Sequence, residues 1–450
     1  MFENQIELEK ENIINTVIEV CKFNSVSKED NTYPFGKACN DALEYMLDIG
    51  KKLGFKTKNV DGYCGYIECG EGEELVGIIG HLDVVPANIE DGWDSNPFHP
   101  IIKDNKIFAR GAIDDKGPVV SALYAMKFVK ENCKLNKRIR LILGLNEEVD
   151  WKCIEYYKQK EEWPTISFSP DANFPCIYAE KMILSVKTIA DFKAAEEIKI
   201  IEFDDKNNAI NVVPKYCSLT IEDKKGDYIS KIIENEKIKI SKLEDNIYKI
   251  ESFGISSHAA HPELGDNAIT NLLISLPEND FVSDMKNIGF FDIYSPKYLG
   301  GEGTEDESGK LSSNIAKVSY KNGKIEISIN LRVPVKTSFE QIKKYYESAS
   351  NFKTEFFKKQ DALYVSKDSY IVKTLTRIFN EEVNGNYEPL AIGGGTYARA
   401  FENCVSFGMT MPEDEDMCHQ VNEYVKIDNL LLATKIYAKT LYELNKNQYC

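Results

Sequence analysis

The stretch that decides the fold is Leu75-Val-Gly-Ile-Ile-Gly-His-Leu-Asp83, in which a short apolar run ends on a histidine and an aspartate. Such a run is typical of a strand buried on both faces, as in a parallel sheet. Similar runs alternate with helical patterns along the chain, which predicts an α/β fold with a mostly parallel sheet and helices on both faces. The predicted helices cover 6–21, 38–53, 118–129, 369–382 and 428–444, and the further strands cover 106–110, 138–145, 166–169 and 405–409. Gly54 and Asp428 are the expected helix caps.

The character of the sequence changes after residue 181. Residues 182–366 show many short strand patterns, such as 325–333, separated by turns rich in Lys, Asp, Glu, Asn and Gly. The α/β pattern returns after this segment. We therefore predict a catalytic domain formed by residues 1–181 and 367–450, interrupted by an inserted α+β lid domain over 182–366.

Composition and charge exclude several classes of protein. The 450 residues are 43% hydrophobic and 28% charged, which is enough apolar material for a folded core. Lys and Arg total 55 against 72 for Asp and Glu, and the net charge of −17 argues against nucleic acid or a membrane surface as a partner. The 11 cysteines include no Cys-x-x-Cys pair, which indicates reduced thiols and a cytoplasmic location.

Five short polar stretches stand out, and four of them lie where a predicted strand ends. Ligand sites of α/β sheets are expected at these carboxyl ends. In the first stretch, His81 and Asp83 are two residues apart and point to the same side of an extended chain. A carboxylate on the second ring nitrogen of a metal-binding histidine fixes its tautomer. The other stretches are Arg110–Gly117, Asn146–Glu148, Ser169–Asp171 and Cys418–Gln420.

Together these stretches supply two histidines and several carboxylates, a donor set that suits zinc or a related divalent metal. The adjacent Glu147 and Glu148 suggest two different roles: one glutamate binds metal, and its neighbour takes a proton from metal-bound water. Each motif alone is weak, because a chain with 72 acidic residues contains such pairs on ordinary surfaces. Their order and spacing carry the hypothesis.

The series Gly-His-Leu-Asp, Arg-Gly-x-x-Asp-Asp-Lys-Gly, Glu-Glu, Ser-Pro-Asp-Ala, Ser-His-Ala, Gly-Gly-Gly-Thr and a late His closely resembles the zinc aminoacylase/carnosinase-type metallopeptidases. Within that group it is most similar to the bacterial dipeptidase V branch, on the stretch Ser169–Pro175 and the large insert. The motifs run in family order from His81 to His419. The resemblance implies two Zn²⁺ ions per chain, with Mn²⁺ or Co²⁺ as substitutes.

The resemblance also implies a ligand for each metal. His81 and Asp171 resemble ligands of the first metal, and Asp114 resembles the carboxylate that bridges both metals. Glu148 and His419 resemble the ligands of the second metal.

Further roles follow by resemblance for the residues beside these ligands. Glu147 resembles the general base, and Asp83 the residue that supports His81. The peptide bond between Asp114 and Asp115 is cis in the family. An aspartate at position 171, where carboxypeptidase-type members have glutamate, favours an aminopeptidase or dipeptidase.

The insert and the glycine-rich turn supply expected substrate contacts. His258 resembles the lid histidine that stabilises the oxyanion, and Asn211 and Arg332 resemble residues that bind substrate. A guanidinium suits a terminal carboxylate because it can bind both oxygens. Gly394 and Gly395 would let the backbone approach the substrate closely. The alternative for Asn211 and Arg332 is that they simply end strands.

These observations predict a dizinc dipeptidase that hydrolyses dipeptides with a free N-terminus through a metal-activated water. An N-acyl-amino-acid deacylase with the same site and a non-catalytic binding protein with the same fold remain open as alternatives. The length of the insert favours a monomer whose His258 serves its own chain, although a homodimer also remains open.

Overall fold

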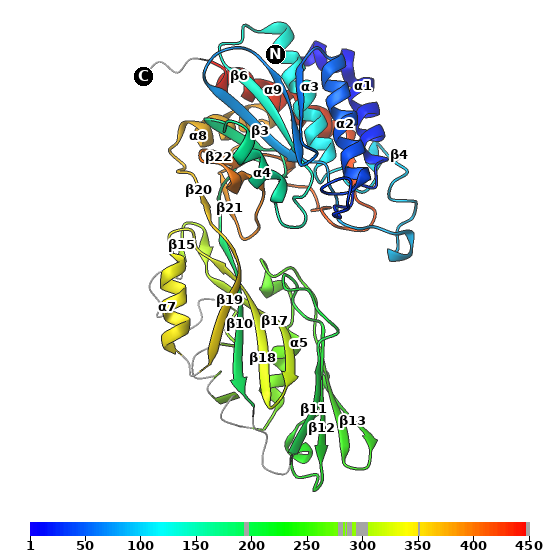
Figure 1. Ribbon diagram of the computed structural model, residues 1–450, viewed down its shortest axis with the longest axis vertical. Coiled ribbons are helices and arrows are strands. Elements are labelled where there is room, and N and C mark those ends of the chain that lie inside the picture. Colours follow the sequence, from blue (N-terminus) through cyan, green and yellow to red (C-terminus); the bar gives the residue numbers. More distant parts are fainter. Residues whose placement is uncertain are drawn as a thin grey trace. The chain divides into compact units, whose positions relative to one another are not determined.

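The structure, a computed structural model, describes residues 1–192, 198–277, 282–283, 285, 290–293, 305–349 and 352–446. Its contacts divide the chain into two compact units (Figure 1). The first comprises Met1–Tyr178, Val365–Leu390 and Thr396–Cys450, and the second comprises Ala179–Tyr364 and Ala391–Gly395. The chain thus leaves the first unit, forms the second and returns.

A nine-stranded sheet, most of which belongs to the first unit, has the order β1-β2-β6-β3-β7-β22-β9-β20, and β21 also pairs with β9. The helices and 3₁₀ turns of this part are α1 (Glu3–Cys21), α2 (Lys37–Lys52), η1 (Ile89–Asp91), α3 (Lys116–Asn132), α4 (Lys152–Lys160), α8 (Tyr370–Val383), η5 (Tyr397–Ala400) and α9 (Ile427–Leu444). The strands of the large sheet are β1 (Lys56–Val60), β2 (Cys64–Cys69), β3 (Leu75–His81), β6 (Arg138–Gly144), β7 (Ile166–Ser169), β9 (Ile177–Glu180), β20 (Leu363–Tyr364), β21 (Leu390–Ile392) and β22 (Cys404–Ser406). Two small sheets pair β4 (Ile101–Lys103), β5 (Lys106–Phe108) and β24 (Tyr424–Lys426), and β8 (Ala172–Asn173) with β23 (Met409–Thr410).

Within the large sheet, the parallel pairs lie at its centre. The strands β6, β3, β7 and β22 pair in parallel, and β1, β2, β9 and β20 add antiparallel edges. The strand β3 is buried along its whole length, as an apolar run between two parallel neighbours requires. The α/β fold class is confirmed, with its parallel strands at the centre.

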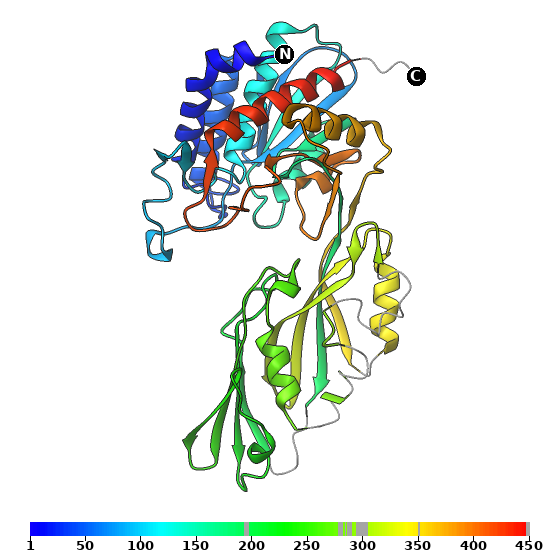
Figure 2. The ribbon, with the colours of Figure 1, turned by 180° about the vertical axis from the view of Figure 1, so that it is seen from behind.

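Helical segments cover both faces of the sheet. A Cβ on Gly80 would lie 2.5 Å from Val119 of α3, so α3 packs on the face of β3 to which Gly80 points. The next residue, His81, points to the opposite face and pairs in register with Gly144 of β6. A Cβ on Gly144 would lie 2.5 Å from Tyr397, which places η5 on that opposite face. On the first face α3 also packs against α1 and α9 (Figures 1 and 2).

The expected helices of the first unit are all present, and their bounds differ by a few residues at most. Gly54 adopts the predicted left-handed conformation, with φ of 75°. The prediction that Asp428 caps the last helix is wrong, because α9 begins at Ile427 and its N-cap is Lys426. The strand β24 runs directly into α9, and pairing with β5 holds Lys426 extended at the position that the cap requires.

The second unit consists of two antiparallel four-stranded sheets with the orders β17-β18-β10-β19 and β11-β12-β14-β13. Its longer strands are β10 (Met182–Asp191), β11 (Ile198–Asp204), β12 (Tyr216–Asp223), β13 (Ile238–Glu244), β14 (Ile247–Phe253), β17 (Ser312–Lys321), β18 (Lys324–Val333) and β19 (Lys353–Gln360). Its remaining elements are η2 (Ile229–Lys231), η3 (Pro262–Leu264), α5 (Ala268–Ser275), β15 (Glu305–Asp306), β16 (Gly309–Lys310) and α7 (Phe339–Ala349). This mixed α+β architecture is the one predicted for the insert.

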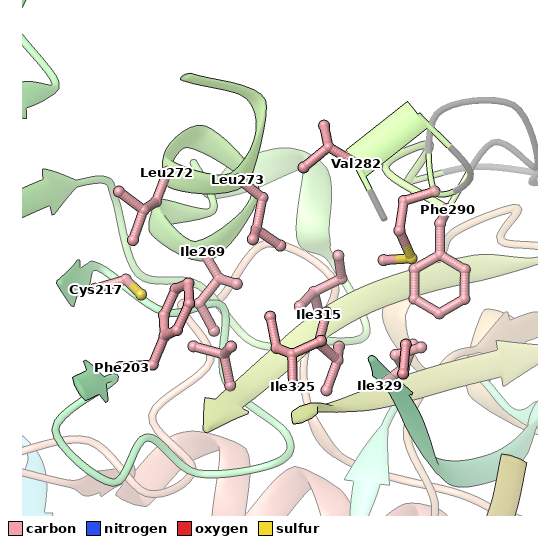
Figure 3. Packing of buried hydrophobic residues seen from close by; sticks show 14 of the residues in the cluster. Phe203, Cys217, Ile269, Leu272, Leu273, Val282, Phe290, Ile315, Ile325 and Ile329 are labelled. Atoms are coloured by element: carbon pink, nitrogen blue, oxygen red, sulfur yellow. The ribbon is translucent and has the colours of Figure 1, made fainter. Parts of the chain in front are cut away.

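One apolar core joins the two sheets of the second unit. Side chains of α5, among them Leu272, lie among residues of both sheets, such as Cys217 of β12 and Ile315 of β17 (Figure 3). All three are at most 3% exposed. Among the helices that the structure describes, none combines the length and the apolar character that a membrane span requires.

Candidate metal centre

His81 stands at the carboxyl end of β3 and is fully buried. Its Nδ1 lies 2.9 Å from the main-chain carbonyl of Asp83, which can only accept a hydrogen bond, so Nδ1 carries the proton. Its Nε2 faces Asp114 Oδ1 at 3.0 Å and Asp171 Oδ2 at 3.5 Å, so a metal ion bound there would take the place of a proton. The prediction had the Asp83 carboxylate on Nδ1, but its Oδ1 is 3.5 Å away and the carbonyl is the closer partner.

The Asp83 carboxylate instead supports the two adjacent glutamates. Its Oδ1 accepts the backbone N–H of Glu147 at 3.0 Å, and its Oδ2 accepts that of Glu148 at 3.1 Å. These glutamates follow β6, which pairs in parallel with β3, so both strands end at the same edge of the sheet. One buried carboxylate thus links the loop after β3 to the loop after β6.

Asp114 lies between the two histidines. Its Oδ1 is 3.0 Å from Nε2 of His81, and its Oδ2 is 3.1 Å from Nε2 of His419. The same nitrogen of His419 is 3.1 Å from Glu148 Oε1. The peptide bond between Asp114 and Asp115 is cis, as the resemblance implies. The polar groups therefore form two halves that share Asp114, one with His81 and Asp171 and one with His419 and Glu148.

The donor set fits a divalent transition metal. Two groups of three side chains could each hold a metal ion: His81, Asp114 and Glu148, and His81, Glu147 and Asp171. In each group, one ligand atom from every side chain lies within 4.8 Å of the ligand atoms of the other two. Donors about 2.0–2.1 Å from a tetrahedral zinc ion lie roughly 3.3 Å apart, close to the separations of 3.0 to 3.5 Å around His81 and His419. Neutral imidazole with carboxylate oxygens is a set that zinc, manganese and cobalt accept.

Burial and mutual repulsion make this cluster electrostatically costly without a cation. Burial raises the pKa of Glu147 well above its usual range, and it raises the pKa of Glu148 to about 7 with help from Asp114. Burial and Asp114 also raise the pKa of Asp171. Although burial opposes it, contact with Asp114 and Glu148 raises the pKa of His419 to about 11. Bound divalent cations would relieve this repulsion and keep the carboxylates ionised.

Position 80, directly before His81, requires a glycine because the Asp115 carboxylate occupies the space beside it. The backbone N–H of His81 donates to Asp115 Oδ2 at 3.0 Å, and a Cβ on Gly80 would lie 2.4 Å from that oxygen. Only glycine leaves room for this carboxylate beside the strand. The sequence places Asp115 beside Asp114 in the motif but does not reveal this contact.

Glu423 is a second residue that sequence analysis missed. It is fully buried, four positions after His419, and it accepts hydrogen bonds from the loop that carries Asp114. Its partners Ile113 and Asp114 lie 310 and 309 residues earlier in the chain, so the sequence does not show these contacts. The one sequence signal for Glu423 is a carboxylate four positions after His419.

The expected substrate residues all lie in the second unit. Val212 and His258 form an isolated antiparallel bridge, and the carbonyl of Asn211 accepts the N–H of Ala259 at 2.8 Å. Nδ1 of His258 accepts the N–H of Ala260 at 3.3 Å, which leaves Nε2 as the protonated nitrogen of the neutral ring. The side chains of Asn211 and His258 are exposed.

Arg332 and the glycine-rich turn join the same region of the second unit. Arg332 is 3% exposed and donates from Nη1 to the carbonyl of Gly393 at 2.7 Å. A Cβ on Gly393 would lie 3.1 Å from Ala260, so the turn packs directly against the His258 loop. Gly394 and Gly395 follow within this turn and are partly exposed. The structure thus brings the metal-site residues together in one unit and the expected substrate residues together in the other.

The sequence is similar to those of known peptidases. Residues 77–443 match the model of Peptidase family M20/M25/M40. The chain is 37% identical over 465 residues to "Putative dipeptidase YtjP" of Bacillus subtilis (strain 168), covering 99% of this chain and 100% of the relative.

Solved structures with low sequence identity share the fold. Human carnosine dipeptidase 1 superposes with a TM-score of 0.61 at 15% identity, covering 98% of both chains. The Bacillus subtilis YXEP protein, described as a dinuclear metal binding peptidase from the M20 family, superposes with a TM-score of 0.56 at 10% identity, covering 97% of this chain and 99% of its own.

Proposed function

Because this chain belongs to Peptidase family M20/M25/M40 and is a metal-dependent peptide hydrolase, we propose that it is a dizinc dipeptidase acting on dipeptides with a free N-terminus. One observation carries the proposal. The two oxygens of Asp114 face two different imidazole nitrogens, at 3.0 Å and 3.1 Å, and each of these nitrogens has a second carboxylate beside it. A single metal would not require this duplication. The name of the Bacillus relative supports the substrate class.

We assign the ligands to two zinc ions. His81 and Asp171 would hold the first ion, Glu148 and His419 would hold the second, and Asp114 would serve both. The proton on Nδ1 of His81, held by the Asp83 carbonyl, leaves Nε2 free for metal. Mn²⁺ or Co²⁺ could occupy the same donors.

Bound in such a site, divalent metals polarise a carbonyl and lower the pKa of a water molecule toward about 7. Glu147 is not needed as a ligand in this assignment, and its backbone is fixed by Asp83. We assign it the role of general base, taking a proton from the attacking water and returning it to the leaving amine. The charge of Asp171 also favours a substrate with a free amine.

We propose that the first unit is the catalytic domain and that the second is the inserted lid, with boundaries near residues 181 and 366. In this proposal Nε2–H of His258 donates to the developing oxyanion. Arg332, Asn211 and the backbone of Gly394 and Gly395 bind the substrate, with the guanidinium on its terminal carboxylate. We further propose that the enzyme is cytoplasmic, in line with the free cysteines among the described residues. We also propose that it works as a monomer.

The test is a matched pair of substrates. The protein is stripped with a chelator, reloaded with Zn²⁺ and given a dipeptide and the N-acetylated form of the same dipeptide. The proposal predicts turnover of the free dipeptide only, and only after reloading. Equal rates on the two forms would favour a deacylase, and binding of both without turnover would favour a non-catalytic protein.

A further inference from the structure

Glu423 occupies a position from which it can control the geometry of the metal centre. We infer that it is a positioning residue that fixes the loop of Asp114 against the loop of His419, and thereby sets the affinity for metal. The inference rests on the proposed function, because it takes Asp114 and His419 as metal ligands. Glu423 itself contacts neither a metal donor atom nor substrate in this account.

Both oxygens of Glu423 are saturated by the loop that carries Asp114. Oε2 accepts Nη1–H of Arg110 at 2.7 Å and the backbone N–H of Gly111 at 3.0 Å. Oε1 accepts the backbone N–H of Ile113 at 2.9 Å and that of Asp114 at 3.2 Å. One carboxylate therefore orders almost every residue of this loop, including the main chain of the proposed bridging ligand.

Strand pairing holds Glu423 in this place. The next residue, Tyr424, begins β24 and pairs in register with Phe108 at the end of β5. The backbone N–H of Ala109 donates to the Glu423 carbonyl at 3.1 Å, which extends the pairing by one step. The chain leaves β5 directly into the loop that ends at Asp114, so this loop must fold over the Glu423 side chain.

Arg110 carries the linkage to the second ligand. It is 4% exposed and stacks over Trp93 with its Cζ 5.2 Å from the ring centroid. While Nη1 binds Glu423, Nη2 donates to the main-chain carbonyl of His419 at 3.3 Å. The guanidinium therefore connects both ligand loops through one buried pair with Glu423.

A buried Arg–Glu pair can also be purely structural, and the chain contains such a pair for comparison. Glu68 is 7% exposed, and its Oε2 accepts Nε–H and Nη2–H of Arg140 at 2.7 Å and 2.6 Å. This pair joins β2 to β6 and contacts none of the proposed ligands. If Glu423 acts only through stability, replacing either glutamate should have the same consequences.

The experiment compares Glu423→Gln with Glu68→Gln in the full chain. A glutamine keeps the shape but turns an –NH₂ toward two of the four donors around Glu423, so the Asp114 loop must shift. Co²⁺ is titrated into metal-free protein, with binding followed by calorimetry and by the visible spectrum of the bound ion, and unfolding of the metal-free proteins is measured in parallel. We expect E423Q to bind Co²⁺ on the order of 10–100-fold more weakly with an altered spectrum, as for other residues that orient metal ligands. E68Q should keep the wild-type affinity and spectrum while losing stability.

Each other outcome has a defined meaning. Wild-type affinity and spectrum in E423Q, or equal losses of affinity in both variants, would overturn the inference and leave the proposed function intact. If the wild-type chain binds no Co²⁺, the proposed function fails, and the inference with it. If E423Q does not fold, Arg110→Lys decides, because lysine can keep the ion pair with Glu423 but cannot also reach the His419 carbonyl. A roughly tenfold loss of affinity in R110K supports the inference, and an unchanged affinity overturns it.

Discussion

Replacing Asp83 by asparagine tests whether one carboxylate positions both glutamates of the site. Asp83 accepts the backbone N–H groups of Glu147 and Glu148 at 3.0 Å and 3.1 Å. Asparagine can accept only one of them and points a donor at the other. A hydrogen bond to a charged acceptor contributes about 1.5–3 kcal/mol and a neutral one about 1 kcal/mol, so the change costs at least about 2 kcal/mol. If the full 2 kcal/mol is lost from the stabilisation of the transition state, kcat/KM falls about 30-fold.

The assay is steady-state hydrolysis of a dipeptide by D83N at saturating Zn²⁺, with bound metal measured on the same samples. The matched control is Asp223→Asn in the second unit. Asp223 is also buried, and its carboxylate accepts the backbone N–H groups of Gly226, Tyr228 and Ile229. D223N should change stability but not kcat/KM. If D83N stays within threefold of the wild type, Asp83 does not position Glu147 for the reaction.

Three further predictions follow from the same geometry. Gly144→Ala places a Cβ 2.5 Å from the buried ring of Tyr397, and we expect a loss of about 1–3 kcal/mol in the free energy of unfolding, measured by denaturant titration; an unchanged stability would mean that the ring moves freely. His419→Ala should bind fewer than two Zn²⁺ per chain by elemental analysis, and two tightly held ions would remove His419 from the ligand set. Mixing His258→Ala with Glu147→Gln should restore no activity at any ratio if each chain serves its own site, and recovered activity would show a dimer that exchanges histidines.

Much of the fold could be predicted because the apolar patterns are strong. The run that forms β3 is buried throughout, and most apolar residues on the predicted faces of α1 and α9 are buried or half-buried, with Leu8 of α1 as an exposed exception. The antiparallel edge strands β1 and β2 and the short helix α4 were not predicted. In α4 only Cys153, Ile154 and Tyr157 are buried, and in β1 only Val60, so tertiary contacts rather than local pattern stabilise these elements.

The sequence motifs predict the family and the candidate metal ligands, but not the contacts that support those ligands. The family resemblance drawn from the motifs is confirmed by the match over residues 77–443. The structure gathers the predicted ligands around His81 and Asp114. The supporting contacts were not readable, because they join residues far apart in sequence, as Glu423 does with Arg110 at 313 residues. Nor could the sequence show that Asp83 would use its carbonyl for His81 and its carboxylate for the glutamates.

The central claim is that Glu147 acts as the base beside two metal ions held by its neighbours. The most direct measurement determines metal content and kcat on one preparation of Glu147→Gln, beside wild type treated identically. Glutamine cannot take the proton but preserves the shape of the site, so the account predicts two Zn²⁺ per chain and a kcat lowered by about 10²–10⁴-fold. Turnover within threefold of the wild type, or loss of metal on this substitution, would contradict it.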